Sequence, residues 1–401
     1  MSAGFLPYGR QDIDAGDLAA VAEALQSGYL TTGPKVGEFE TAFAKAVGAK
    51  HAVASNSGTA ALHLACVALD LGPGDSVVVP AVTFLATANA ARFCGAEVIF
   101  ADVDPDSGRL TAAAFEAALA ANSRAAVRAV LPVHLNGHSV DMAAIRAIAE
   151  PRGIAVIEDA CHAVGGLQQA GNGSMAPVGA CALSEFAAFS LHPVKTITSG
   201  EGGVTTTNDE AAYRRMCRFR THGMVREPKE FLHPDLGLDA EGTANPWYYE
   251  MQELGFNYRI TDFACALGSS QLKRLDGYAK RRRELQARYD RLLVPLAPVI
   301  RPVPAAPGDD PVLHLYAVLI DFEKIGRSRA RVMHDLKAAG IGTMVHYIPV
   351  NRQPYYRQRY GESRLPGAEA YYARCLSIPF YPTMQDGDVD RVVDALQALT
   401  R

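Results

Sequence analysis

One lysine of the chain stands in an unusual setting. Lys195 lies within Phe189-Ser-Leu-His-Pro-Val-Lys-Thr-Ile-Thr-Ser-Gly-Glu-Gly-Gly203, among small residues, a proline and glycines, and no acid follows it before Glu201. Removing an ammonium group from water lowers its pKa from about 10.4, which gives a neutral amine that can attack an aldehyde or a carbonyl. Taken alone, the segment also fits a loop lysine that reaches solvent.

An acidic pair ends another apolar run. Glu158 and Asp159 close the run that begins at Ile154, and Ala-Cys-His162 follows. If the run is a strand, one carboxylate must point into the crevice at the sheet end, where it needs a cationic or hydrogen-bonding partner. Asp159 could cap a helix there, or it could be the counter-ion of a protonated heterocycle.

A turn of small residues is the third candidate site. In Ser55-Asn-Ser-Gly-Thr-Ala-Ala61 a predicted strand ends, and a helix is predicted from Thr59. Gly58 would allow close approach, and the hydroxyls of Ser57 and Thr59 would join the N–H groups of the first helical turn in binding an anion. An ordinary helix N-cap explains the same residues, and the spacing matches neither a Walker A loop nor GxGxxG.

Alternating elements would place the three groups together. Short apolar runs alternate with Ala/Leu-rich helical stretches such as Thr59–Leu69 and Leu110–Ala121. This pattern predicts an α/β fold with a mostly parallel sheet covered on both faces, and such sheets bind ligands at the strand ends. The predicted strands are His51–Ser55, Ser76–Pro80, Glu97–Asp102, Ala126–His134, Ile154–Asp159, Glu185–Ser190 and Gly203–Thr207.

The rest of the chain predicts a second, smaller domain. Residues 208–275 read as helical and irregular, with an aromatic-rich loop around Pro246-Trp-Tyr-Tyr249. We expect a large domain of residues 1–270 and a C-terminal α+β domain of residues 271–401. The predicted elements of the small domain are a helix over Asp276–Leu293, a strand over Leu313–Ile320, a helix over Ser328–Ala339, a strand over Thr343–Ile348 and a helix over Val389–Leu399.

A single ligand could use all three candidate groups. Pyridoxal 5′-phosphate (PLP) carries a phosphate, a ring nitrogen and an aldehyde. The anion site, Asp159 and Lys195 together therefore predict PLP as the cofactor. No cysteine or histidine spacing predicts a metal site.

Six motifs follow one another along the chain. They are Ser57-Gly-Thr-Ala-Ala61, Pro80-Ala-Val-Thr-Phe-Leu-Ala-Thr87, Glu158-Asp-Ala-Cys-His162, Phe189-Ser-Leu-His-Pro-Val-Lys195, Gly200-Glu-Gly-Gly203 and Gly255-Phe-Asn-Tyr-Arg-Ile-Thr-Asp262. Motifs in this order resemble those of the DegT/DnrJ/EryC1/StrS nucleotide-sugar aminotransferases, and the similarity covers nearly the whole chain. That resemblance implies the fold-type-I architecture of PLP-dependent transferases.

The resemblance implies a role for each matching residue. Lys195 would bond to the cofactor aldehyde and act as general base and acid, and Asp159 would keep the pyridine nitrogen protonated. Asn257 would reach a phosphate across a dimer interface, which implies a homodimer with shared active sites. The other implied cofactor contacts are Ser57, Gly58, Thr59 and Ser190 at the phosphate, Phe84 stacked on the ring and His162 near the 3′-oxygen.

The substrate side also follows from the resemblance. The motifs Tyr8–Ile13, Tyr29–Lys35 and Val345–Val350 are similar to those of the branch that acts in pseudaminic acid biosynthesis, although Asn351 stands where a histidine is expected. That branch implies transfer of an amino group from L-glutamate to C4 of a UDP-linked 4-keto-6-deoxy-HexNAc sugar, which would form UDP-4-amino-4,6-dideoxy-N-acetyl-β-L-altrosamine. The implied substrate contacts are Lys35, His192, Arg259, His314, Tyr316 and Tyr347.

Three alternative functions also have to be considered for this sequence. One is an aminotransferase for another nucleotide ketosugar, such as a GDP-perosamine-type enzyme. A PLP-dependent sugar dehydratase fits less well, because those relatives carry histidine where Lys195 stands. The last is a catalytically silent regulatory homologue, against which the set of Lys195, Asp159 and Ser190 argues.

Composition excludes other classes of protein. The 401 residues carry a net charge of −4 and have a pI near 6.3, which gives no electrostatic case for nucleic acid or an acidic membrane. Seven cysteines without CxxC spacing argue against a disulfide framework, and the N-terminal residues do not form a signal peptide. We therefore expect a cytoplasmic protein.

Overall fold

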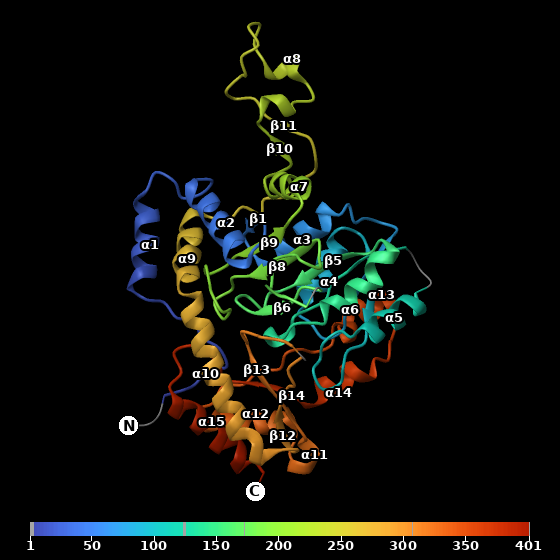
Figure 1. Cartoon of the computed structure of the whole chain (residues 1–401), viewed down its shortest axis with the longest axis vertical. Coiled ribbons are helices and arrows are strands. Elements are labelled where there is room, and N and C mark those ends of the chain that lie inside the picture. Colours follow the sequence, from blue (N-terminus) through green and yellow to red (C-terminus); the bar gives the residue numbers. More distant parts are fainter. Residues whose placement is uncertain (1–3, 123–125, 172, 307, 401) are drawn as a thin grey trace.

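A computed structural model describes residues 4–122, 126–171, 173–306 and 308–400. Figure 1 shows a central sheet between helices, a smaller sheet with the C-terminal helices below it, and an arm that projects from the opposite end. Within the described residues, no helix is both long enough and apolar enough to cross a membrane.

The central sheet has seven strands in the order β1-β9-β8-β5-β4-β2-β3. β9 is antiparallel to both of its neighbours, and every other neighbouring pair is parallel, so the predicted mostly parallel sheet is confirmed. The strands are β1 (His51–Ser55), β2 (Asp75–Pro80), β3 (Glu97–Ala101), β4 (Ala126–Val130), β5 (Ala155–Asp159), β8 (Phe186–Ser190) and β9 (Gly203–Thr207).

Both faces of this sheet are buried, because alternate residues of its apolar strands face opposite sides. Val77 and Val79 pack with α3, α4 and α7, whereas Val78 packs with α5 and α6. The helices of the large sheet are α1 (Ala15–Gln26), α2 (Pro34–Val47), α3 (Gly58–Ala68), α4 (Leu85–Phe93), α5 (Ala112–Ala121), α6 (Met142–Ala149), α7 (Glu210–Arg220) and α9 (Asp262–Lys273), and a small hairpin pairs β6 (Leu167–Gln169) with β7 (Met175–Pro177).

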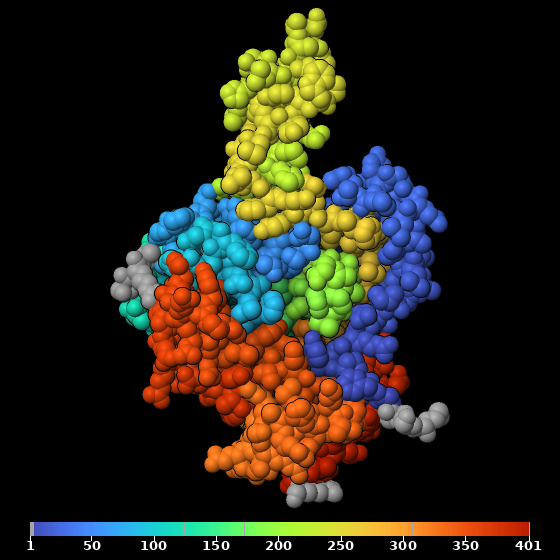
Figure 2. All heavy atoms as spheres, turned by 180° about the vertical axis from the view of Figure 1, so that it is seen from behind, coloured from blue at the N-terminus to red at the C-terminus, as the bar shows by residue number. Residues whose placement is uncertain are grey.

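An arm follows α7 and returns before α9. Its base is the two-stranded pairing of β10 (Met224–Val225) with β11 (Glu250–Met251), and α8 (Pro234–Gly237) lies near its tip. Figure 2 shows the arm standing clear of the body. Its large apolar side chains are therefore exposed, and Trp247 is 73% exposed.

The C-terminal part has its own sheet and core. β12, β13 and β14 form an antiparallel sheet whose buried residues pack against α10, α12 and α15, and Leu6 of the N-terminal segment joins that core. We propose the domain boundary at residues 270/271. The elements are α10 (Leu275–Leu293), β12 (Ile300–Pro302), β13 (Tyr316–Ile320), α11 (Phe322–Ile325), α12 (Arg329–Ala338), α13 (Pro354–Tyr360), α14 (Pro366–Arg374), β14 (Cys375–Ile378) and α15 (Asp386–Ala398).

Three predicted strands differ from the structure, and one of them, predicted over Leu313–Ile320, begins only at Tyr316 as β13. The segment Thr343–Ile348 is not a strand: it makes one isolated bridge, between Met344 and Ser377, and then turns toward the cavity described below. The strand beside β13 is instead β14. β4 ends at Val130 rather than His134, because Pro132 has no N–H for the ladder.

Candidate active site

A cavity of about 860 Å³ opens at the carboxyl ends of β1, β5 and β8. The C-terminal part closes it with residues 344–347 and His314. The lining residues are Tyr8, Asn56, Ser57, Gly58, Thr59, Leu62, Thr83, Phe84, Ala86, Val133, Asp159, Cys161, His162, Ser190, His192, Val194, Lys195, Glu201, His314, Met344, Val345, His346 and Tyr347.

Lys195 lies on the turn after β8 and lines this cavity. Its backbone N–H donates to the carbonyl of His192 at 2.9 Å, which fixes the turn. Burial lowers the pKa of its ammonium group, and the negative charge of Asp159 only partly offsets that effect. The geometry therefore favours the neutral, nucleophilic amine that the sequence predicted.

Asp159 ends β5 and points into the same cavity. The Thr87 hydroxyl donates to Oδ2 at 2.6 Å, and the backbone N–H of Cys161 donates to Oδ1 at 3.2 Å. Because Thr87 uses its only proton on Asp159, Thr83 must donate to Thr87 across 2.7 Å. A relay of two threonines thus holds the carboxylate in place.

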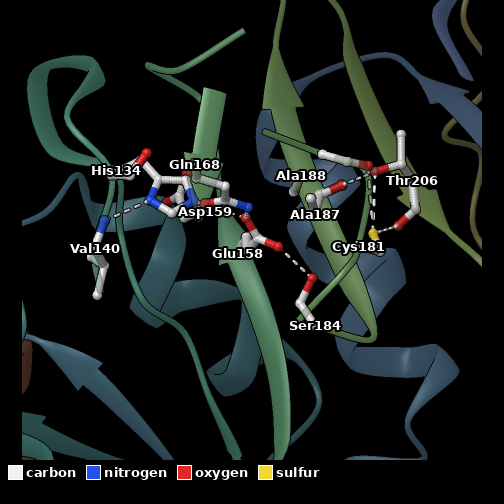
Figure 3. Close-up of polar contacts among 12 residues, drawn as sticks. His134, Val140, Glu158, Asp159, Gln168, Cys181, Ser184, Ala187, Ala188 and Thr206 are labelled. Atoms are coloured by element: carbon white, nitrogen blue, oxygen red, sulfur yellow. Dashed lines mark hydrogen bonds and ion pairs between the residues drawn. The ribbon is translucent and has the colours of Figure 1, made fainter. Parts of the chain in front are cut away.

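Glu158 points to the other face of the sheet, as strand alternation requires (Figure 3). His134 Nε2 and Gln168 Nε2 each donate to its Oε2 at 2.8 Å, and the Ser184 hydroxyl donates to Oε1. Burial opposes the charged form, but these hydrogen bonds lower the pKa of Glu158 below its ordinary value. Asp159 is therefore the one carboxylate of the pair that can meet a ligand.

The start of α3 meets the end of β8 at very close range. A Cβ on Gly58 would lie 2.8 Å from Ser190 Cβ, so only glycine fits there. Ser57 caps the helix by accepting from the Ala60 N–H at 3.1 Å, and the earlier N–H groups of the turn lie at the cavity wall. With the hydroxyls of Thr59 and Ser190 they could bind an anion.

His162 and Tyr347 form a hydrogen-bonded pair. The backbone N–H of Asn136 donates to His162 Nδ1 at 3.3 Å, so Nε2 carries the proton and donates to the Tyr347 hydroxyl at 3.0 Å. Burial lowers the pKa of His162 and raises that of Tyr347, which keeps both groups neutral. The Tyr347 proton is then available to an acceptor in the cavity.

Two further histidines line the wall near Lys195. The ring of His314 lies 4.7 Å from that of His162, and its Nδ1 is buried without a partner among the described residues. His346 shares a hydrogen bond of 2.8 Å with the Ser377 hydroxyl. Burial is the main cause that lowers the pKa of each, for His346 to about 3. Both of these imidazoles are therefore uncharged beside Lys195 at neutral pH.

These groups fit PLP. The cradle of α3 suits the phosphate, Asp159 suits a ring N–H and Lys195 suits the aldehyde. Phe84 is 55% exposed at the cavity wall, which excludes simple core packing.

A model described as the DegT/DnrJ/EryC1/StrS aminotransferase family matches residues 11–397. The chain belongs to this family. It is 39% identical over 401 residues to the spore coat polysaccharide biosynthesis protein SpsC of Bacillus subtilis (strain 168), a match that covers 99% of this chain and 97% of SpsC.

Solved structures agree with that assignment. Helicobacter pylori PseC, an aminotransferase involved in the biosynthesis of pseudoaminic acid, superposes with a TM-score of 0.86 at 27% identity over 99% of both chains. DesI, solved in the presence of its TDP-sugar product, superposes with a TM-score of 0.83 at 29% identity over 100% of this chain and 94% of its own. The predicted family and fold class are confirmed.

Most predicted site residues of this aminotransferase meet in the one cavity. The implied cofactor contacts Ser57, Gly58, Thr59, Phe84, Asp159, His162, Ser190 and Lys195 line it, together with the implied substrate contacts His192, His314 and Tyr347. The structure shows where these residues lie, and their roles in binding cofactor and substrate stay predictions.

Four predicted residues lie outside the cavity of their own chain. Tyr316 is buried elsewhere and donates its hydroxyl to Asp290 at 2.5 Å. Lys35 pairs with Glu23 and Glu38 at 3.2 and 3.3 Å, and Arg259 lines a separate hollow beside α2. Asn257 is exposed, and its carbonyl accepts from the Asn56 side chain at 3.3 Å.

Sequence reasoning gave no role to several residues that the structure brings into the site. Thr87 and Tyr8 stood within motifs that matched the family, which was the available signal. His346 lies in the segment Thr343–Ile348, which was predicted to be a strand, so it was given no role in the site. Thr83 lies in the same motif as Thr87, but the motif did not indicate its contact with the Thr87 hydroxyl.

Proposed function

We propose that this aminotransferase uses PLP to move the amino group of L-glutamate to C4 of a UDP-linked 4-keto-6-deoxy-HexNAc sugar. The observation that carries the proposal is the shared cavity of Lys195, Asp159, Phe84 and the α3 cradle. When bound, PLP draws electrons from the carbon that bears the amino group, so that a proton can leave that carbon.

Residues of the chain would transfer the protons and hold the cofactor and substrate. Neutral Lys195 can take a proton from the donor carbon and later deliver a proton to C4 of the sugar, because its amine lines the cavity in which both substrates would bind. Asp159, held by Thr87 and the Cys161 N–H, keeps a proton on the ring nitrogen. Tyr347, fixed by His162, supplies a hydrogen bond within the cavity.

The sugar class rests on similarity. The printed descriptions of SpsC and PseC concern polysaccharide and pseudoaminic acid biosynthesis, which supports an amino sugar and, through PseC, the product UDP-4-amino-4,6-dideoxy-N-acetyl-β-L-altrosamine. The TDP-sugar product of DesI favours a second candidate, transamination of a ketosugar on another nucleotide. A GDP-perosamine-type substrate belongs to that candidate.

A homodimer completes the proposal. Asn257 directly follows the arm, whose exposed Leu232, Leu236 and Trp247 have no cover from their own body. Burying such apolar surface against a second copy would be favourable, and it would bring Asn257 to the partner's phosphate site.

A substrate panel tests the function. Purified protein loaded with PLP is assayed with L-glutamate and UDP-, TDP- and GDP-linked 4-ketosugars, and 2-oxoglutarate is measured. The expected result is fastest turnover of the UDP sugar. Faster turnover of a TDP or GDP sugar would overturn the UDP assignment, and no turnover of any ketosugar would favour the silent homologue.

A further inference from the structure

A second reactive cluster lies between α3 and α4, outside the catalytic cavity. His63 and Cys66 are three residues apart on α3 and so share one face of that helix. Cys94 caps the C-terminal end of α4, which packs against α3, and the ring of the adjacent Phe93 lies 5.5 Å from that of His63. Two thiols and an imidazole therefore converge at this contact.

The His63 imidazole is held through one of its two ring nitrogens. Tyr258 shares a 3.0 Å hydrogen bond with His63 Nδ1, and burial raises the pKa of Tyr258, so its phenol keeps a proton to donate. His63 is only 2% exposed, and its Nε2 has no hydrogen-bond partner of standard geometry among the described residues. An Nε2–H that has no other acceptor can donate a hydrogen bond to a nearby thiolate.

Cys94 is the thiol that this environment activates. The neighbouring Cys66 thiol and, to a smaller extent, the His63 imidazole lower the pKa of Cys94 to about 6, against the effect of burial. Cys94 is also partly exposed, whereas Cys66 is buried. Low-pKa thiols that small oxidants can reach, with a second thiol beside them, form the usual setting for reversible oxidation.

We propose that Cys94 is a peroxide-reactive thiol and that Cys66 resolves its oxidised form into a disulfide between α3 and α4. The Cys94 thiolate attacks one peroxide oxygen, the O–O bond breaks, and protonation of the other oxygen releases water and leaves a sulfenic acid. The Cys66 sulfur then attacks that sulfur; an S–S bond forms, the S–O bond breaks, and the Cys66 proton leaves with hydroxide as water. Overall, two thiols lose two electrons and one hydrogen peroxide becomes two waters.

The bond would join two helices of the cofactor site. α3 begins at the anion cradle, and α4 begins directly after Phe84 and carries Thr87. A disulfide near the C-terminal ends of α3 and α4 would make the positions of their N-terminal ends depend on the redox state of the cell. The inference does not depend on which sugar the enzyme uses.

Peptide mapping of the full-length, PLP-loaded protein tests the proposal. After limited hydrogen peroxide, non-reducing digestion should yield a Cys66–Cys94 linked peptide, and Cys66→Ser should leave a Cys94 sulfenic acid that dimedone traps. Iodoacetamide at pH 7 should label Cys94 about fivefold faster than Cys217, since a larger thiolate fraction outweighs lower nucleophilicity.

Cys217 is the matched control. It is also partly exposed, but burial raises the pKa of its thiol. Labelling of Cys94 at the rate of Cys217, or oxidation that never links Cys94 to Cys66, would overturn the proposal. Circular dichroism of Cys66→Ser and Cys94→Ser checks that each variant folds.

Discussion

The pKa of Lys195 and the orientation of Asp159 depend on neighbours that are distant in sequence. Burial in the cavity removes the Lys195 amine from water, and Asp159 on β5 accepts a hydrogen bond from Thr87 on α4. The two residues themselves could be predicted, because an isolated lysine and an acidic strand end are visible locally. The threonine relay and the His162–Tyr347 pair could not, because each joins segments that only the fold brings together.

Replacing Lys195 tests its role in moving protons. Lys195→Ala should lower kcat by about 10³-fold, within the usual range for losing a general base. Lys280→Ala, an exposed lysine on α10, is the control and should keep full activity. Glutamate-dependent formation of 2-oxoglutarate is the measurement, and a Lys195→Ala enzyme with more than a tenth of the activity would contradict the role.

His346 makes stability depend on pH. Its folded-state pKa is about 3 and its unfolded value is about 6.5, so below pH 6.5 the unfolded state binds more protons. The free energy of unfolding should thus fall on acidification from pH 6.5 toward 3 and be unaffected by His346 above pH 7. Burial lowers the pKa of His162 and His314 too, and these contribute with the same sign.

Urea unfolding between pH 4 and 6 measures this dependence. In His346→Gln the slope of the unfolding free energy against pH should decrease by about 1.4 kcal/mol per pH unit. His334→Gln changes an exposed histidine and should keep the wild-type slope. Equal slopes in wild type and His346→Gln would show that His346 titrates normally in the fold.

At the scale of elements, the site depends on how α3 meets β8. Six of the seven strands of the large sheet were predicted within one residue of their observed bounds, because their apolar runs are continuous, whereas β4 ends four residues earlier than predicted. β14 was missed and Thr343–Ile348 was misassigned, since both segments are short, apolar and adjacent in space. Local pattern cannot tell which of two such segments pairs with β13.

Gly58→Ala should weaken PLP binding at least about tenfold. The added methyl group would lie 2.8 Å from Ser190 Cβ, so α3 must move away from β8 and the anion cradle must widen. Gly72→Ala is the control, because nothing lies within 4 Å of its Cβ position. Fluorescence titration with PLP gives both affinities, and equal values would show that the close contact does not shape the site.

At the scale of the molecule, the proposed homodimer would share its active sites through the arm and Asn257. A C2 dimer would place each Asn257 at the partner's cavity, which explains why a residue with an implied phosphate role lies outside its own. Neither feature could be derived from periodicity in the sequence, since the strand pair of the arm, β10 with β11, has only two residues in each strand.

Hybrid dimers test that arrangement. Lys195→Ala and Asn257→Ala proteins, each weakly active, are unfolded together and refolded. If Asn257 acts on the partner, half of the dimers regain one intact site, and activity should recover to about one quarter of wild type. Activity no higher than the average of the two parents would place Asn257 in its own subunit's site or outside any site.

The link between Lys195 and PLP is the claim on which the proposed function depends. Protein saturated with PLP is treated with borohydride, digested and analysed by mass spectrometry. The mass of one reduced cofactor should appear on the peptide that contains Lys195 and be absent from Lys195→Ala. No adduct on that peptide, with PLP in excess, would contradict the proposed function.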